Sequence, residues 1–383
     1  MDFDLNEEQR GALETARKLV VREIEPIVDD WDREGRFPQE VVSSMGREGL
    51  FGCAFTAEYG GSSLGFLAHA VVCEEISRAW SSLRSFFNSQ ALTVPLTILD
   101  NGTDEQKAKY VKPLVTAQKI GMIGITEPDS GSDVAGITTT AKKVGDSYVL
   151  NGSKTWISHA PNFDYGIALA KTDPSKRHGG ISIFIVERDD PGVGVRAIEH
   201  KLGHLADPIG EVIFTDCILP ADRLLGPENG GFKIIMKALD HGRLSVASGA
   251  IGVAQAAFDC AVQYATERTQ FGKLIGKFQM VQKMIADMAC SVESARFMTW
   301  RCAVDKDCGR SSTISSAKAK LTASEAAVNC AGWNMEIHGG YGYSKEYRAE
   351  RLFRDAKMYQ IGEGTSNIQR IIIANDALGF KKR

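Results

Sequence analysis

The sequence predicts an α+β protein in which two helical domains flank a middle β domain. Apolar residues recur at helical spacing before about residue 120, turn to short alternating runs as far as about residue 225, and then return to the helical period. A chain of 383 residues is also too long for one ordinary core. We therefore expect an N-terminal α-helical domain over 1–120, a β-barrel or sheet domain over 121–225 and a C-terminal four-helix bundle domain over 226–383.

The first helix is predicted to begin after Asn6. The Asn6 side chain can cap this helix, and Gln9, three residues later, can complete a capping box. Apolar side chains follow at helical spacing. Further helical patterns cover 38–49, 66–79 and 85–117, and the glycines and serines of 58–65 predict a loop between them.

Beyond Gly121 the pattern is that of short strands. The runs 138–144 and 147–158 are joined by Gly145 and Asp146, a turn signal that predicts a hairpin. No connection in this region holds a helix long enough for a parallel crossover, which argues against a dinucleotide-binding sheet. Further strands are expected at 164–171, 181–187, 193–199 and 211–217.

Long helical patterns return in the last part of the chain. These stretches are rich in Ala, Met, Ile and Val and are joined by short glycine-containing connections, as in an antiparallel four-helix bundle. The predicted helices cover 230–267, 276–308, 313–337 and 366–379.

The composition is that of a soluble globular protein, with 43% hydrophobic and 24% charged residues. A net charge of −3 gives no reason to expect a nucleic-acid partner. No uninterrupted apolar run reaches the ~18 residues of a membrane span, and the N-terminus shows neither an apolar signal core nor an Arg-rich transit segment. We therefore expect a cytoplasmic protein.

The eight cysteines form no Cys-x-x-Cys pair and no cysteine–histidine ligand spacing. This pattern argues against a disulfide framework and against a zinc site. We expect buried thiols in a reducing compartment, no metal, and histidines that lie on the surface or have partners in the core.

Five motifs carry the chemical information. Glu363 lies in IGEGTSNIQR (361–370), and upstream lie GITEPDSGSDVAG (124–136), NGSKTWIS (151–158), RTQFGK (268–273) and EIHGGYGYSKEYRAERLFRD (336–355). In this order and at these spacings the motifs resemble those of the acyl-CoA dehydrogenase family across nearly the whole chain. The resemblance implies an FAD-dependent enzyme that oxidises the Cα–Cβ bond of an acyl thioester.

In that family a single carboxylate acts as the base, and Glu363 occupies its position. The resemblance implies that Glu363 removes the α-proton while flavin N5 takes the β-hydride. The main-chain N–H of Glu363 and a ribityl hydroxyl would hydrogen-bond the thioester carbonyl, as in an oxyanion hole. An electron-transfer flavoprotein would then reoxidise the flavin. Gly364 is expected beside the substrate, and Thr365 and Asn367 at FAD, although Asn367 departs from the commoner Gln or Glu.

The flavin ring is expected near the first two motifs. By resemblance, main-chain groups of Ile123, Ile125 and Thr126 approach the ring, Trp156 packs against it and Ser158 places a hydroxyl at N5. A neutral tricycle is held by close main-chain contacts, and a donor at N5 stabilises the reduced ring.

The other end of FAD is expected to meet a neighbouring subunit. By resemblance, Arg268 and Phe271 reach the FAD of that subunit, and Gly339 and Gly340 let the main chain approach its phosphates. A cofactor shared in this way implies a homo-oligomer, and the family is usually tetrameric. Glu336 departs from the family's Gln and is not expected to be a firm ligand.

The acyl group is harder to predict. Ser132 is expected at the pantetheine part of the substrate, and Arg243 either behind the active site or in a structural pair. SSLRSFFNSQ (81–90) resembles the segment of glutaryl-CoA dehydrogenases whose arginine, here Arg84, meets the distal carboxylate. Gly362 stands where many relatives have an aromatic residue, which weakens the case for decarboxylation.

Three functions remain open from the sequence. The first is an acyl-CoA dehydrogenase for a short or acidic acyl group. The second is an acyl-carrier-protein dehydrogenase that serves secondary metabolism, because a related Leu-Arg-Ser run occurs there. The third is a silent flavin-binding or partner-binding protein, against which the presence of Glu363 argues.

Overall fold

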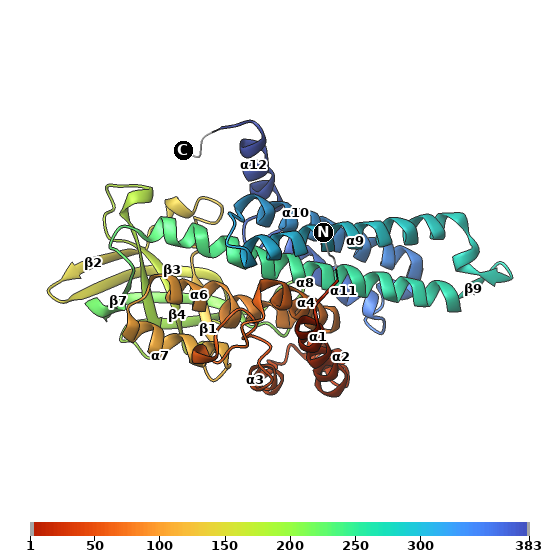
Figure 1. The fold of residues 1–383 in the computed structure, drawn as a ribbon, viewed down its shortest axis with the longest axis horizontal. Coiled ribbons are helices and arrows are strands. Elements are labelled where there is room, and N and C mark those ends of the chain that lie inside the picture. Colours follow the sequence, from red (N-terminus) through yellow and green to blue (C-terminus); the bar gives the residue numbers. More distant parts are fainter. Residues whose placement is uncertain (1–3, 381–383) are drawn as a thin grey trace.

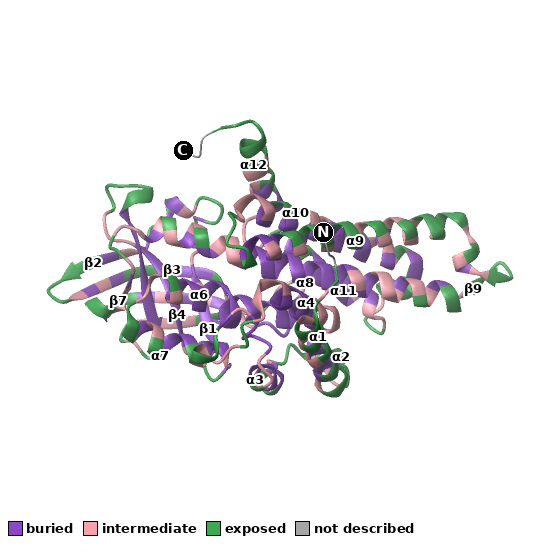
Figure 2. Ribbon diagram, viewed as in Figure 1, coloured by how far each residue is buried: buried purple, intermediate pink, exposed green. Residues whose placement is uncertain are grey.

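A computed structural model describes residues 4–380. The molecule is elongated, with the β-sheet at one end of the long axis and paired long helices at the other (Figure 1). Buried residues gather in the strands and along the helices at the centre, while the far helical tip is mostly exposed (Figure 2). The predicted α+β class, with a sheet domain between helical N- and C-terminal domains, is confirmed.

The N-terminal helices begin as predicted but are more broken than expected. Asn6 and Gln9 form the predicted capping box. The prediction of one helical stretch over 85–117 is wrong, because Gly102 takes an extended conformation and Thr103 caps a new helix. The helices are α1 (Glu7–Leu19), α2 (Val28–Glu34), α3 (Gln39–Arg47), α4 (Gly65–Ala79), α5 (Arg84–Phe86), α6 (Thr93–Asn101) and α7 (Asp104–Val115), with π-helical turns at Val20–Ile24 and Phe87–Ala91.

The middle sheet has eight strands and is mostly antiparallel. The predicted hairpin is confirmed: β2 and β3 pair antiparallel around Gly145, whose φ of +58° suits glycine. The sequence did not predict β1, which pairs parallel with β4. The order is β6-β7-β3-β2-β4-β5-β8, and the bounds are β1 (Gly121–Gly124), β2 (Thr140–Val144), β3 (Ser147–Ser158), β4 (Tyr165–Lys171), β5 (Ile181–Glu187), β6 (Val193–Ile198), β7 (Ile209–Pro220) and β8 (Leu224–Leu225).

The C-terminal bundle consists of α8 to α11. The fourth helix of the bundle is α11, not the predicted stretch 366–379; that stretch forms α12, which packs on α10 and projects from the body (Figure 1). By length and composition α8 could cross a membrane, but 72% of its apolar window is buried inside the protein. The bounds are α8 (Gly231–Glu267), α9 (Gln279–Asp307), α10 (Thr313–His338), α11 (Arg348–Tyr359) and α12 (Ser366–Ala377), with a short hairpin of β9 (Thr269–Gln270) and β10 (Lys273–Leu274).

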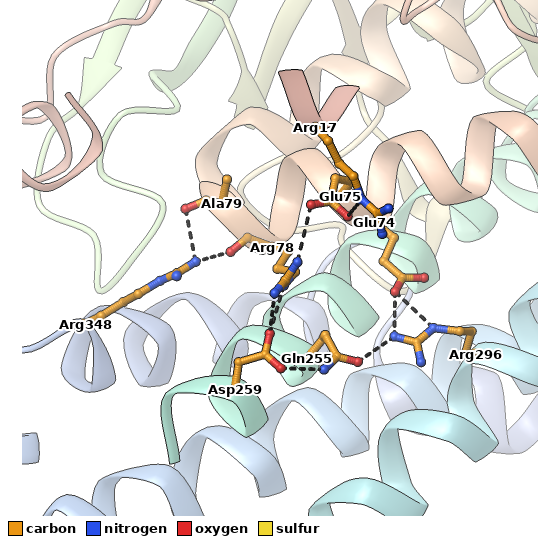
Figure 3. A network of polar contacts seen from close by, with 9 residues as sticks. All are labelled: Arg17, Glu74, Glu75, Arg78, Ala79, Gln255, Asp259, Arg296 and Arg348. Atoms are coloured by element: carbon orange, nitrogen blue, oxygen red, sulfur yellow. Dashed lines mark hydrogen bonds and ion pairs between the residues drawn. The ribbon is translucent and has the colours of Figure 1, made fainter. Parts of the chain in front are cut away.

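A polar network fixes α4 against the bundle (Figure 3). Arg296 of α9 pairs with Glu74 at 2.7 Å, and Arg78 pairs with Asp259 of α8 at the same distance. Arg348 donates to main-chain carbonyls of residues 78 and 79 at the end of α4. The chain turns from this anchored end directly into the segment that carries Arg84.

All eight cysteines are free thiols. Five are buried and Cys260 is partly buried, but Cys290 and Cys308 are exposed, so the expectation of uniformly buried thiols is wrong. The two exposed residues lie on or just after α9, at positions that the helical pattern alone did not distinguish. Within residues 4–380 there is no cluster of three or more His, Cys, Asp or Glu side chains suited to a metal ion.

Candidate active site

Glu363 lies in the base loop, which we define as residues 360–365 between α11 and α12. Its φ of +54° is in the left-handed region, which is uncommon for a residue with a β-carbon. Its Oε1 accepts a hydrogen bond from Asn88 Nδ2 at 2.7 Å. Its Oε2 is buried and has no hydrogen-bond partner among residues 4–380. One carboxylate oxygen is thus anchored, and the other is free to accept a proton.

Gly242 on α8 leaves room for this carboxylate. A β-carbon at Gly242 would lie 2.9 Å from Glu363 Oε2 and 2.8 Å from Thr93 Oγ1, closer than real β-carbons approach. The Thr93 hydroxyl is also buried without a hydrogen-bond partner in the described chain. Two unpaired buried oxygens therefore lie beside a position without a side chain. Such atoms are rare in native proteins unless a ligand or water completes the site.

The electrostatic surroundings suit Glu363 to proton transfer. Burial raises the pKa of its carboxyl group above the ordinary value. The charges of Arg84, Arg243 and Lys320 and the hydrogen bond from Asn88 lower this pKa, but they do not cancel the effect of burial. A carboxylate with a raised pKa is better matched to accept a proton near neutral pH.

Arg84 is a buried cation without a carboxylate partner. It is 5% exposed, and within the described residues it forms no ion pair. Its Nη2 lies 3.6 Å from Met358 Sδ, its Nε has no partner, and its Cζ lies 5.7 Å from the centre of the Tyr359 ring. Gly249 makes space for this side chain, since a β-carbon there would lie 2.3 Å from Arg84 Cγ. A buried guanidinium in this state is costly unless an anion joins it.

Two further cations surround the base loop. Arg243 on α8 is buried and pairs with Asp240 at 2.5 Å, while its Nε has no hydrogen-bond partner in the part of the chain that is described. Lys320 on α10 is fully buried, and its Nζ donates to the carbonyl of Gly364 at 2.9 Å. Gly364 thus has an occupied carbonyl next to Glu363.

The segments predicted to meet the flavin ring lie side by side. Thr155 N donates to Thr126 O at 2.9 Å, and Lys154 Nζ lies 3.4 Å from Ile125 O. Trp156 is 61% exposed and has a φ of +60°, at a point where the pairing of β3 with β7 shifts register. A large exposed indole that directly follows these contacts in the chain is suited to pack against a planar ring.

Ser158 ends the same strand, and its Oγ donates to Asp207 Oδ2 at 3.3 Å. Ile123 lies in neighbouring β1. Ser132 is exposed on the loop between β1 and β2. His159 is fully buried, its Nδ1 lies 3.4 Å from Asp207 Oδ1 and its ring stacks on Phe86, which agrees with the expectation that core histidines have partners.

A second group of predicted cofactor residues lies at the opposite end of the long axis, near β9 (Figure 1). Arg268, Gly339 and Gly340 line a cavity of about 490 Å³. The Arg268 guanidinium lies 5.3 Å from the centre of the Tyr341 ring. Phe271 is 93% exposed at the hairpin turn. One chain therefore holds two separate halves of the predicted cofactor site.

Thr365 and Asn367 lie at the start of α12. Thr365 caps this helix, because its Oγ1 accepts from Ile368 N at 3.2 Å. Asn367 is exposed, and its Oδ1 accepts from Arg370 at 3.2 Å. Thr365 is the last residue of the base loop and Asn367 lies in the first turn of α12, but only Thr365 has a structural role evident within one chain.

Sequence reasoning missed Asn88, Gly242 and Lys320. Asn88 lies one helical turn after Arg84, and that spacing was the one available signal for it. Gly242 and Lys320 lie within long helical patterns that predict core packing. Their places beside Glu363 depend on tertiary contacts.

The chain is similar in sequence to known proteins over nearly its whole length. The chain is 44% identical to glutaryl-CoA dehydrogenase of Desulfococcus multivorans, over 100% of this chain and 99% of the relative. It is 39% identical to the short-chain specific acyl-CoA dehydrogenase of Clostridium acetobutylicum, over 98% and 99%. It is also 40% identical to the CarC subunit of a caffeyl-CoA reductase-Etf complex of Acetobacterium woodii, over 96% and 98%.

Solved structures and family models agree with these relatives. A glutaryl-coenzyme A dehydrogenase in complex with glutaryl-CoA has a TM-score of 0.97 at 43% identity, covering 100% of this chain and 98% of that one. PigA with FAD and proline has a TM-score of 0.95 at 29% identity, covering 100% of both chains. The prolyl acyl carrier protein oxidase AnaB has a TM-score of 0.94 at 29% identity, covering 98% and 100%. The models for the N-terminal, middle and C-terminal domains of acyl-CoA dehydrogenase match residues 6–118, 122–217 and 229–378, so the chain belongs to the acyl-CoA dehydrogenase family.

Proposed function

We propose that this protein is an FAD-dependent acyl-CoA dehydrogenase that oxidises the Cα–Cβ bond of a short or acidic acyl-CoA, with Glu363 as the catalytic base. The observation that carries the proposal is the buried Glu363 carboxylate, which has one oxygen held by Asn88 and one without a partner among residues 4–380. A carboxylate that served only the fold would be expected to have both oxygens satisfied.

The residues present fit FAD at both ends. Trp156, whose indole is exposed and can stack on a planar ring, directly follows Lys154 and Thr155, which contact the main chain of Ile125 and Thr126. At the other end, the cavity with Arg268 combines a cation with glycines around which an added β-carbon would meet no atom within 4 Å. A guanidinium and close main-chain approach suit a pyrophosphate. When bound, FAD supplies the acceptor for the β-hydride.

The protein's own groups would handle the α-proton and the thioester carbonyl. The free Oε2 of Glu363 accepts the proton, and its raised pKa makes that transfer favourable. No hydrogen bond between described residues uses the main-chain N–H of Glu363, so this group is available to the thioester oxygen. A donor placed there stabilises the enolate character that develops as the proton leaves. Ser158 would place its hydroxyl at the hydride acceptor.

Arg84 supports an acidic acyl group. A buried guanidinium with no ion pair in the described chain gains most from a ligand that brings a carboxylate. Its neighbours Met358 and Tyr359 directly precede the base loop. A glutaryl-like substrate would then place its distal carboxylate at Arg84 and its α-carbon at Glu363.

The separation of the two cofactor halves supports a homo-oligomer of at least two chains, and the family resemblance favours a tetramer built as a dimer of dimers. Strand β3, which carries Trp156, belongs to the sheet at one end of the long axis, and β9, which follows Arg268, lies at the other end (Figure 1), so a second copy would complete each site. An electron-transfer flavoprotein is the proposed acceptor, since the Acetobacterium woodii relative belongs to an Etf complex. Free thiols and the burial of the apolar face of α8 are in keeping with a cytoplasmic location.

The test is anaerobic bleaching of the bound flavin by a panel of thioesters. Glutaryl-CoA should reduce the flavin faster than butyryl-CoA, and the native protein should hold one FAD per chain. Likeness to the carrier-protein oxidase keeps a phosphopantetheinyl-protein thioester as the second candidate. Bleaching by carrier-bound but not by CoA-bound thioesters would favour that candidate. Stable flavin that no thioester bleaches would refute both.

A further inference from the structure

The carbonyl of Gly364, next to the proposed base, accepts two buried donors. Lys320 Nζ of α10 and Gln369 Nε2 of α12 each lie 2.9 Å from this oxygen. Both side chains are 0% exposed. Within residues 4–380 Lys320 forms no ion pair, and its ammonium group makes this one hydrogen bond. A buried ammonium without a carboxylate partner is costly, so its position calls for a reason beyond packing.

The base loop has a conformation that must be held. Glu363 and Gly364 both have positive φ, at +54° and +82°. A residue with a β-carbon is disfavoured in this region and stays there only when its surroundings fix it. At Gly364 a β-carbon would lie 2.9 Å from Gln369 Nε2, so the same contact that holds the loop also requires glycine.

One face of α10 holds both ends of the base loop. Ser324 lies one turn after Lys320, and its Oγ donates to the carbonyl of Tyr359, just before the loop, at 2.8 Å. Lys320 holds Gly364 near the end of the loop. Two buried side chains one helical turn apart thus donate hydrogen bonds to main-chain carbonyls on either side of Glu363.

The charge of Lys320 also acts on Glu363. Burial lowers the pKa of Lys320 to about 7, while the Glu363 carboxylate raises it and Arg243 and Arg84 lower it further. In return, Lys320 lowers the pKa of Glu363, together with Arg84 of α5, Arg243 of α8 and the Asn88 amide. Lys320 is therefore coupled to the proposed base through both the main chain and the electric field.

We propose that Lys320 is a positioning residue for Glu363: its hydrogen bond to the Gly364 carbonyl holds the base loop in the left-handed conformation that places the carboxylate between Asn88 and Gly242. The expected effect of Lys320 on catalysis rests on the proposed function, whereas its effect on the conformation of the base loop does not. Lys320 does not contact the reacting atoms, and its effect passes through the main chain of the loop.

The test uses two variants that separate the hydrogen bond from the charge. Lys320→Met removes both the donor and the positive charge. Gln369→Leu removes no charge; it removes the second donor to the Gly364 carbonyl, a donor that also lies 3.3 Å from the Glu363 carbonyl. Lys318→Met is the matched control, because Lys318 lies on the same helix but is exposed. Each variant is compared with the native holoenzyme for FAD content, for flavin reduction by acyl-CoA and for hydrogen exchange of peptides that cover residues 360–365.

Both variants should slow the maximal rate of flavin reduction by about 10- to 100-fold, as a misplaced catalytic group does. The thioester concentration for half-maximal rate should change less than about threefold, because the loop positions the base and does not hold the rest of the thioester. Only Lys320→Met should move the acid limb of the pH–rate profile to higher pH, since it removes a charge that favours the ionised carboxylate. Amides of the base loop should exchange faster in both variants than in Lys318→Met.

A native rate of reduction in Lys320→Met, or exchange of the base loop equal to that in Lys318→Met, would overturn the proposal. The exchange measurement needs no substrate, so it decides whether Lys320 holds the loop even if no thioester reduces the flavin and the proposed function fails. If Lys320→Met does not fold, Lys320→Gln gives the same two decisions on rate and exchange, because its uncharged side chain is one atom shorter and ends short of the Gly364 carbonyl. A native rate and native exchange of the base loop in a folded Lys320→Gln would overturn the proposal.

Discussion

The side-chain amide of Asn88 donates to the carboxylate of Glu363 at 2.7 Å, although 275 residues separate them in the sequence. Asn88 lies in the π-helical turn that directly follows Arg84 and α5. One short buried segment therefore carries both the donor to the proposed base and the guanidinium proposed to bind the acyl carboxylate. This arrangement fixes the distance between the two ends of the proposed acyl site.

Replacement of Asn88 by alanine should shift the acid limb of the kcat/KM profile to higher pH. In the proposed mechanism the ionised carboxylate is the active form, so activity rises with pH through the pKa of Glu363, which burial raises and Asn88 lowers. Loss of this hydrogen bond removes a contact that favours the ionised form, so the pKa should rise further. Asn101→Ala is the control, because the amide of Asn101 bonds to Thr97 in α6. A limb that does not move in Asn88→Ala would exclude this coupling.

Arg84→Met should reduce the preference for glutaryl-CoA over butyryl-CoA. The substitution removes a buried cation that has no ion pair within residues 4–380, so a dicarboxylic acyl group would lose its partner. We expect a loss of about 2–4 kcal/mol in relative kcat/KM, in the range for truncating one member of a buried charge pair. Butyryl-CoA should be little affected. Parallel loss with both substrates would assign Arg84 to the scaffold.

Gly249→Ala should also reduce the preference for glutaryl-CoA over butyryl-CoA, by a smaller amount, although Arg84 is not substituted. The new β-carbon would lie 2.3 Å from Arg84 Cγ and 2.9 Å from the Tyr359 hydroxyl, so the arginine must move. Overpacking of this kind costs about 1–3 kcal/mol of stability. Gly332→Ala in α10 is a matched control, since no atom lies within 4 Å of its added β-carbon. Kinetic assays with both thioesters should show altered selectivity in Gly249→Ala alone.

Glu127→Gln should destabilise the sheet domain in a pH-dependent manner. Burial would raise the pKa of Glu127, but Lys154 and main-chain and hydroxyl donors of residues 138 and 139 outweigh it and lower this pKa to about 2. Burial lowers the pKa of Lys154 to about 8 despite Glu127, which opposes the pairing. Near neutral pH the pair should stabilise the fold on balance, because the ionised Glu127 accepts these additional hydrogen bonds and Lys154 remains charged.

A carboxyl group with a lowered folded pKa stabilises the protein fully above its unfolded pKa of ~4.3, and this contribution disappears as pH falls through about 2. The native–variant difference in unfolding free energy, measured by urea denaturation, should therefore be about 3–5 kcal/mol near pH 7 and shrink below about pH 5. Glu58→Gln at an exposed site serves as the control. A difference that stays constant with pH would show that ionisation of Glu127 does not matter.

The sequence correctly predicted structural features that depend on residues close together in the chain. The capping box of Asn6 and Gln9 and the turn at Gly145 depend on residues a few positions apart, and both are confirmed. Strand β1 was missed because its four residues include two glycines, and its pairing partner β4 begins at Tyr165. The break at Gly102 was missed because the apolar pattern continues on both sides of it.

Some residues of the candidate site could likewise be predicted from local motifs, and others depend on tertiary contacts. Glu363 and Arg84 could be found because they lie in recognisable motifs. Gly242 and Lys320 could not be found, because an interior helical glycine or lysine gains its role only when another helix brings the base loop against it. Burial and the unpaired state of Glu363 Oε2 are also properties of the assembled fold.

Glu363→Gln, assayed by anaerobic flavin reduction with the best thioester substrate, tests the central assignment most directly. Glutamine is nearly isosteric and can keep a contact with Asn88, but it cannot accept the α-proton. The variant should fold and retain one FAD per chain, while reduction slows by ~10³-fold or more. Reduction at the native rate in a folded, FAD-loaded variant would contradict the assignment and place the base elsewhere.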